Sequence, residues 1–158
     1  NGQLQTLGSD HCAFSFKGKK ELGRGDFSKI PNGGPIIEDR LAILFSEGVK
    51  KGRITLNQFV EISSTRIAKL FGIFPQKGTI AVGSDADIVI FDPNQERTIS
   101  AEAHHMNVDY NPFEGMKVTG VPVSVLSRGE FVIKQQQFVG SPGKGKYLKR
   151  KRYNAKNV

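Results

Sequence analysis

The chain has 158 residues, of which 37% are hydrophobic and 24% charged, a composition typical of a folded globular protein and unlike that of disordered or fibrous chains. No apolar run approaches the roughly 20 residues that span a bilayer, and the single cysteine, Cys12, cannot form an internal disulfide. We therefore expect a cytoplasmic protein with no membrane partner.

The formal charge of +8 is concentrated near the C-terminus, because residues 139–158 hold seven Lys/Arg and no acidic residue. The rest of the chain is nearly neutral. Clustered cations can contact phosphates, but no recognition motif accompanies this tail, so we expect no nucleic-acid partner. A solvated tail or an arm that contacts another subunit is the favoured interpretation. Because the chain begins at Asn1 without an initiator methionine, we expect it to be a segment of a longer protein.

The first predicted element is a short strand over residues 4–7. Gly8, Ser9 and Asp10 follow, and these small polar residues and the glycine end the strand, which places Asp10 at its C-terminal end. Residues 11–36 contain too many glycines and prolines for a long helix and predict an extended loop. Loops of this length often carry function.

Two helical stretches are expected next. The first begins near Ile37 and ends at Gly48 or Gly52, with a broad apolar face. The second begins at the sequence Thr55-x-x-Gln58, a capping box whose hydroxyl and amide groups can bond the free N–H groups of a helix start.

Hydroxyl side chains at residues 63–65 predict that this second stretch restarts as another helix, which Gly72 ends. After Pro75 the pattern changes to short strands separated by turns. Six strands are predicted, over residues 79–82, 86–91, 97–99, 117–119, 121–126 and 131–133. They predict a β-meander or a β-sandwich, with a domain boundary near residue 76.

Three sequence segments carry recognisable motifs: residues 8–12, residues 29–40 and residues 77–92. The third alone is typical of the wider amidohydrolase superfamily. In this order and spacing, with residues 111–116 following, the three resemble the hydantoinase/dihydropyrimidinase branch of the cyclic amidohydrolases, in the D-hydantoinase form of Bacillus-type bacteria. The resemblance covers nearly the whole chain.

The resemblance implies an α/β fold. Residues 1–76 would be the last strand and helices of a (β/α)8 amidohydrolase barrel, residues 77–138 part of a small β-sandwich, and residues 139–158 a basic C-terminal tail. In such barrels the chemistry takes place at the C-terminal ends of the strands, which is where Asp10 is expected.

The resemblance also implies an activity, hydrolysis of the ring amide of hydantoins and dihydropyrimidines to N-carbamoyl amino acids. Two divalent metal ions, zinc in most relatives, would be bridged by a carboxylated lysine that lies outside this chain. Asp10 would ligate one metal and carry a proton to the departing ring nitrogen. The backbone of Asn32 would bind and orient the cyclic amide substrate. From the local sequence alone, a turn-capping role is favoured for Asp10, and the match of the three segments reverses that preference. Asn32 before two glycines is also typical of a turn, which is compatible with substrate binding.

Other possible metal ligands are disfavoured. Side chains of neighbouring residues on an extended segment point to opposite faces, so His11 is expected to point away from Asp10. His104 and His105 lack the His-x-His spacing of the family and are expected to be surface or packing residues, while Cys12 is expected to be a small buried hydrophobe. Because the remaining ligands belong to strands this chain lacks, residues 1–158 alone are expected to be inactive.

Two kinds of alternative stay open at this point. The main one is a non-catalytic, collapsin-response-mediator type of interaction protein with the same fold, and Asp10 and Asn32 favour an enzyme over it. Allantoinases and dihydroorotases are less similar around Asp10. Members of the family assemble as dimers or tetramers, so a homo-oligomer is expected, with the basic tail as a candidate arm between subunits.

Overall fold

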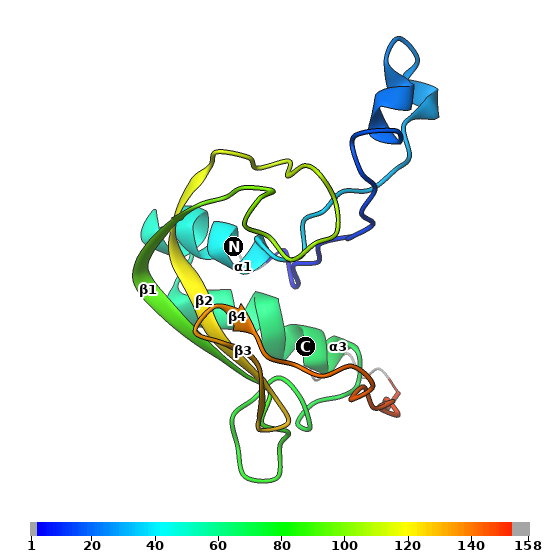
Figure 1. The fold of residues 1–158 in the computed structure, drawn as a ribbon. Coiled ribbons are helices and arrows are strands. Elements are labelled where there is room, and N and C mark those ends of the chain that lie inside the picture. Colours follow the sequence, from blue (N-terminus) through cyan, green and yellow to red (C-terminus); the bar gives the residue numbers. More distant parts are fainter. Residues whose placement is uncertain (1–2, 153–158) are drawn as a thin grey trace.

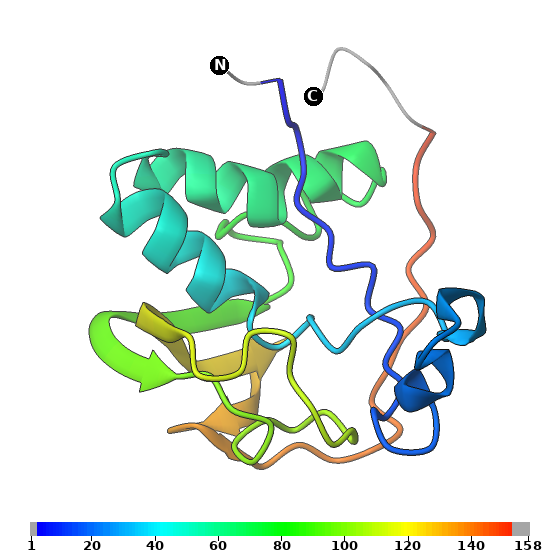
Figure 2. The ribbon, with the colours of Figure 1, turned by 90° about the horizontal axis from the view of Figure 1, so that it is seen from above.

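A computed structural model of the chain describes residues 3–152. It has two layers, with the helices packed on one face of an antiparallel sheet (Figures 1 and 2). Two short 3-10 helices, η1 and η2, lie in a loop that projects from the body (Figure 1). In chain order the elements are η1 (Lys20–Gly23), η2 (Phe27–Lys29), α1 (Arg40–Leu44), η3 (Phe45–Lys50), α2 (Leu56–Val60), η4 (Glu61–Thr65), α3 (Arg66–Leu70), β1 (Ile88–Thr98), β2 (Lys117–Ser127), β3 (Glu130–Lys134) and β4 (Gln137–Phe138).

The helices form two rods. In the first, α1 continues directly into η3, a π-helical turn that ends at Lys50, close to the predicted end. In the second, the predicted capping box is confirmed: the Thr55 hydroxyl accepts a hydrogen bond from the Gln58 N–H at 3.2 Å, and the Gln58 amide oxygen accepts one from the Thr55 N–H at 2.8 Å. The predicted restart at residues 63–65 is wrong, because the π-helical turn η4 joins α2 to α3 without a break.

The sheet has the strand order β1-β2-β3-β4, which confirms the β-meander. The predicted strands 86–91 and 97–99 belong to one long strand, β1, which bulges between Asp92 and Glu96 where it pairs with β2. The predicted strands 117–119 and 121–126 likewise merge into β2. The short strand β4 was not predicted. The described residues form one sheet, so the second sheet of a sandwich stays a prediction.

Two predicted strands are absent from the described part of the chain. Residues 79–82 are irregular and lead into a turn at Val82; Ile80 and Val82 are 84% and 108% exposed, because no described strand lies beside them. Residues 4–7 are not part of a strand, and the Leu7 N–H donates to the Ile62 carbonyl at 3.0 Å, in the helical layer. An apolar alternating run forms a strand only where a neighbour can accept its hydrogen bonds.

The core lies between the first helical rod and the sheet. Ala42 from α1 packs against Ile99, Val118 and Val121, and all four are buried. Gly120, in the middle of β2, has φ 94° and no side chain because a β-carbon there would stand 2.3 Å from the ring of Phe45.

Phe45 is also the centre of an aromatic cluster that fixes the two rods to the sheet. Its ring centroid lies 5.6 Å from that of Phe59 in α2 and 4.8 Å from that of Phe91 in β1. The N-terminal segment runs past the helices and leads to the projecting loop (Figure 2). None of the helices within residues 3–152 is long and apolar enough to cross a membrane.

Candidate active site

The N-terminal segment, residues 3–10, runs beside the helices and ends at Asp10. Its Leu7 bonds the helical layer twice: the N–H donates to Ile62, and the carbonyl accepts from the Arg40 guanidinium at 3.2 Å. Asp10 follows this anchored stretch with an exposed carboxylate. Its location at the end of the segment is the one expected for the family's metal-binding aspartate.

Asp10 has a backbone φ of 47°, in the left-handed region that non-glycine residues adopt rarely. Aspartate tolerates this region better than most residues because its short polar side chain can bond locally. Unusual backbone angles of this kind cost about 1–3 kcal/mol and collect at functional sites. The turn at Asp10 therefore supports a functional role without assigning one.

Immediately after Asp10 the chain contacts the C-terminal end of the projecting loop. His11 forms an isolated parallel β-bridge with Gly34, and its Nδ1 accepts a hydrogen bond from the Ile36 N–H at 3.3 Å. Gly33 has φ 101°, and a β-carbon on it would stand 2.5 Å from both the β-carbon and the carbonyl oxygen of Cys12. Only glycine permits this approach.

Asp10 and Asn32 consequently lie on neighbouring segments, although 22 positions separate them in the sequence. Asn32 is exposed, and within residues 3–152 neither its backbone N–H nor its carbonyl has a hydrogen-bond partner. An exposed carboxylate and a free backbone donor and acceptor thus lie on two neighbouring segments. Such a pair can bind a small cyclic amide beside a proton carrier.

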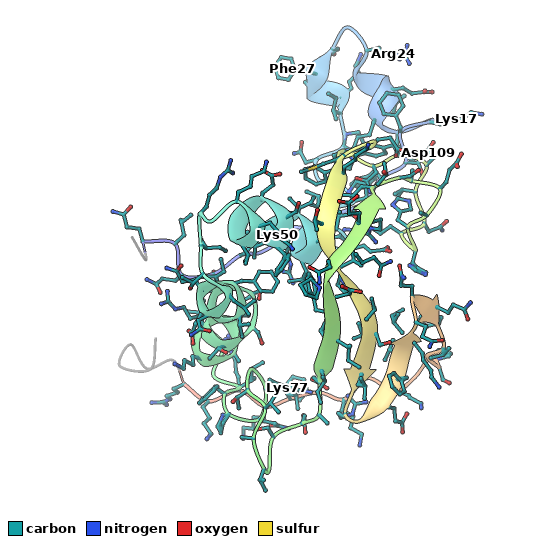
Figure 3. All side chains as sticks on the ribbon, turned by 90° about the vertical axis from the view of Figure 1, so that its left-hand side faces the viewer. Lys17, Arg24, Phe27, Lys50, Lys77 and Asp109 are labelled. Atoms are coloured by element: carbon teal, nitrogen blue, oxygen red, sulfur yellow. The ribbon has the colours of Figure 1, made fainter. Side chains whose placement is uncertain are left out.

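The base of the projecting loop is tied to the sheet side of the molecule by Asp109. The Asp109 carboxylate accepts hydrogen bonds from the backbone N–H of Phe16 at 2.6 Å and of Lys17 at 3.0 Å, and these N–H groups lower the pKa of Asp109 below its ordinary value of 3.8. The Phe16 ring meets that of Tyr110 edge to face, with centroids 5.9 Å apart. Figure 3 shows Asp109 at the base of the loop and Lys17, Arg24 and Phe27 farther out.

The sequence motifs gave no role to a buried set of hydrogen-bonded polar side chains around Asp39, which we call the Asp39 joint. Asp39, only 2% exposed, accepts hydrogen bonds from the Arg97 guanidinium and from the Asn111 side-chain amide, both at 2.7 Å. Asn111 in turn accepts one from the Phe113 N–H at 2.9 Å. Both Asp39 and Asn111 stand in the motifs that carry the family resemblance, and that was the available signal.

All three histidines have partners within the protein. His11 bonds Ile36, His104 bonds the Val108 carbonyl through Nε2 at 3.0 Å, and His105 bonds Glu38 through Nδ1 at 2.9 Å. None of them joins Asp10 in a cluster: within the described residues no group of three or more His, Cys, Asp or Glu side chains could hold a metal.

Asp10 is suited to act as one ligand of a metal ion. Its carboxylate is exposed and has no hydrogen-bond partner among residues 3–152, so both oxygens are available. One carboxylate cannot hold a binuclear centre, and the other ligands would have to come from outside this chain. Cys12 is exposed, so the prediction of a buried cysteine is wrong; it packs its backbone against Gly33 at the surface instead.

Comparison with known proteins gives a consistent set of relatives. The model of the amidohydrolase family matches residues 1–132. The chain is 80% identical over 155 residues to a D-hydantoinase of Geobacillus stearothermophilus, a match that covers 98% of this chain and 33% of that relative.

Solved structures agree with the sequence comparison. A crystal structure of a D-hydantoinase superposes with a TM-score of 0.94 at 80% identity, covering 97% of this chain and 33% of that chain. A crystal structure of a dihydropyrimidinase from Brevibacillus agri gives a TM-score of 0.94 at 72% identity, with the same coverage. The chain therefore spans about a third of the length of the relatives it matches.

Proposed function

The chain belongs to the amidohydrolase family, and we propose that it works as part of a longer enzyme that hydrolyses the ring amide of hydantoins and dihydropyrimidines to N-carbamoyl amino acids. The relatives named D-hydantoinase and dihydropyrimidinase support this substrate class. We call this proposed longer protein, which carries residues 1–158 together with the other metal ligands, the full-length enzyme.

The observation that carries the proposal is the placement of Asp10 beside the segment of Asn32. The β-bridge between His11 and Gly34 and the contact of Gly33 with Cys12 bring the two together. Each matches a site residue of the family, and only the folded chain makes them neighbours. A turn cap and a loop asparagine with purely local roles would not need this arrangement.

The chemistry at Asp10 is proton transfer during amide cleavage. When bound, two divalent metal ions, zinc in our proposal, would lower the pKa of the attacking water and polarise the ring carbonyl. Asp10 would ligate one of them, accept the proton released as water adds to the carbonyl carbon, and give it to the ring nitrogen as the C–N bond breaks. The product is an open chain with one new N–H and one new carboxylic acid, which ionises by releasing the second proton of the water to solvent, so atoms and charge balance.

Asn32 would position the ring for this attack. An amide ring offers one N–H donor and one carbonyl acceptor, and the free backbone carbonyl and N–H of Asn32 complement them. Backbone groups on a short turn are more rigid than a side chain, so the ring would be held at little entropic cost.

Further properties of the full-length enzyme follow the same resemblance. We propose a (β/α)8 barrel to which residues 1–76 contribute, a β-sandwich to which residues 77–138 contribute, and a homo-oligomer, dimer or tetramer, in which the tail contacts another subunit. The zinc content and the cytoplasmic location stay predictions.

The non-catalytic alternative is not favoured. The relatives matched over nearly the whole chain are named as enzymes, and this chain has the carboxylate and the asparagine that an enzyme requires.

The proposal is tested by assaying hydrolysis of hydantoin and dihydrouracil with the purified full-length enzyme. Ring opening of either compound that stops when a chelator removes bound metal would support it. Metal-loaded protein that opens neither ring would contradict it.

A further inference from the structure

Lys20, at the start of η1, reaches back from the projecting loop to the turn that carries Asn32. Its ammonium group donates hydrogen bonds to the carbonyl of Pro31 and, at 2.6 Å, to the carbonyl of Gly33. It also lies 5.6 Å from the centroid of the Phe14 ring. Two of the three donors of the ammonium group are thus used on backbone carbonyls, and the charge also lies near the face of an aromatic ring.

The two carbonyls that Lys20 holds flank Asn32 on either side. A trans peptide is planar, with its C=O and N–H pointing in opposite directions. The peptide that contains the Pro31 carbonyl also contains the Asn32 N–H, so holding that carbonyl toward Lys20 turns the Asn32 N–H to the opposite side. Holding Gly33 as well fixes the second end of the turn.

The groups that Lys20 leaves free are those of Asn32 itself. Within residues 3–152 its N–H and carbonyl have no partner, although the carbonyls before and after it are both bonded. Gly33 adds to the need for restraint, because glycine has the most backbone freedom of all residues and adopts φ 101° here. The Lys20 side chain thus orders the turn, while the backbone N–H and carbonyl of its central residue, Asn32, stay free to bond a ligand.

We propose that Lys20 is a positioning residue for the substrate: by clamping the Pro31 and Gly33 carbonyls it holds the backbone of Asn32 in the orientation that binds the cyclic amide ring. This inference rests on the proposed function. Lys20 does not touch the substrate, and it acts through the Pro31–Asn32 and Gly33–Gly34 peptide groups.

A purely structural role is less consistent with the contacts. The base of the projecting loop is attached independently, by the Asp109 carboxylate bonded to the N–H groups of Phe16 and Lys17. The other end is attached by the bridge of His11 to Gly34. Without Lys20 the loop would remain anchored at both ends, and the main loss would be the fixed geometry of the turn between them.

The test compares Lys20→Met with Lys20→Arg and Lys20→Gln in the full-length enzyme. Methionine keeps the length of the side chain and removes its donors, arginine keeps the charge and several donors, and glutamine supplies a shorter amide donor. Lys19→Met is the matched control, because Lys19 is the exposed neighbour and its side chain has no hydrogen bond or ion pair among residues 3–152. The measurements are kcat and KM for hydantoin and dihydrouracil, the bound metal and the melting temperature.

We expect Lys20→Met to raise KM about 10-fold, since about one hydrogen bond to the substrate would be lost. kcat and metal content should stay within about twofold of the parent, because the interaction contributes equally to substrate and transition state. Lys20→Arg should recover most of the affinity, Lys20→Gln part of it, and Lys19→Met should match the parent. If Lys20→Met fails to fold, the same test is made with Lys20→Arg and Lys20→Gln, whose KM values should rise in that order.

The opposing results are distinct. A parent that hydrolyses the ring while every Lys20 variant keeps its KM within twofold would overturn the positioning role and leave the proposed function standing. Loss of metal and of kcat at unchanged KM would also overturn it, by showing that Lys20 supports the fold. A metal-loaded parent that hydrolyses neither compound would overturn the proposed function, and this inference with it.

Discussion

A β-carbon placed on Gly33 would stand 2.5 Å from the β-carbon of Cys12, well inside the contact distance of two carbon atoms. The contact joins the segment after Asp10 to the turn that carries Asn32. The geometry of the candidate site therefore depends on the absence of a side chain at one position, and Gly33 gives the first prediction.

Replacing Gly33 with alanine should push the two segments apart and strain a backbone angle, φ 101°, that alanine avoids. We expect a loss of at least about 1–3 kcal/mol in unfolding free energy and a higher KM in the full-length enzyme. Gly25→Ala is the control, because Gly25 has φ 80° but nothing within 4 Å of its β-carbon. Urea unfolding and steady-state kinetics measure both effects. Equal behaviour of the two variants would contradict a special role for the Gly33–Cys12 contact.

Asp10→Asn should abolish most of the activity of the full-length enzyme. The amide cannot carry the proton to the ring nitrogen, so we expect kcat to fall about 10²–10⁴-fold, and the bound metal to decrease as one ligand weakens. The control Glu102→Gln removes an exposed carboxylate whose side chain has no partner among the described residues and should leave kcat unchanged. An Asp10→Asn enzyme with normal kcat would remove Asp10 from the site.

The buried joint at Asp39 should matter for stability more than any surface pair. Asp39→Ala leaves the Arg97 guanidinium and the Asn111 amide without their acceptor, and removing one partner of a buried ion pair costs about 3–5 kcal/mol. The control Glu47→Gln weakens the exposed pair with Lys51, where solvent screens the charges, and should shift the urea midpoint little. Comparable midpoints for the two variants would show that the Asp39 joint is not a major source of stability.

A second charged cluster predicts how stability depends on pH. Burial disfavours the charged form of Lys77, but its hydrogen bonds with Asp87 and Asp85 outweigh this and raise the pKa of Lys77 above 10.5. The bond from Lys77 lowers the pKa of Asp85 below 3.8; for Asp87, the bonds from Lys77 and Arg128 outweigh burial and lower its pKa too. Figure 3 shows Lys77 at the end of the molecule away from the projecting loop.

The direction of the effect follows from these shifts. The two aspartates contribute their full stabilisation above pH 3.8, and that contribution is lost as the pH falls through their lowered pKa values. Lys77 contributes its full stabilisation below pH 10.5, and that contribution is lost as the pH rises through its raised pKa. The parent should therefore exceed Lys77→Met in urea midpoint between these limits, and the difference should shrink outside them. Lys117→Met, an exposed lysine, is the control. A difference independent of pH would argue against the ion pairs.

Local sequence signals predicted the elements whose partners are also local. The capping box at Thr55 and Gln58 closes within four residues, and the hairpins of the meander join strands that follow one another in the sequence. Residues 79–82 have the composition of a strand but no described strand beside them to pair with, so they stay irregular. The sequence pattern of residues 79–82 could not show that no described strand lies beside them, because strand pairing depends on residues that are distant in the sequence.

The candidate site shows the same limit. Motif resemblance gave Asp10 and Asn32 as separate residues, and their juxtaposition became visible only in the fold, through Gly33 and the bridge of His11 to Gly34. Lys20 had no signal at all, because one lysine in a loop with several others looks like a solvated charge. The exposure of Cys12 was missed because local apolarity does not reveal which face of a short segment meets solvent.

The most direct test of the central claim is to measure hydantoin and dihydrouracil hydrolysis together with bound metal, for the full-length enzyme and for residues 1–158 alone. We predict about two metal ions per chain and ring opening in the full-length enzyme, and neither in residues 1–158, because the described residues hold no group of three or more side chains that could bind a metal. A full-length protein that binds no metal and opens neither ring would contradict the account and favour a non-catalytic relative.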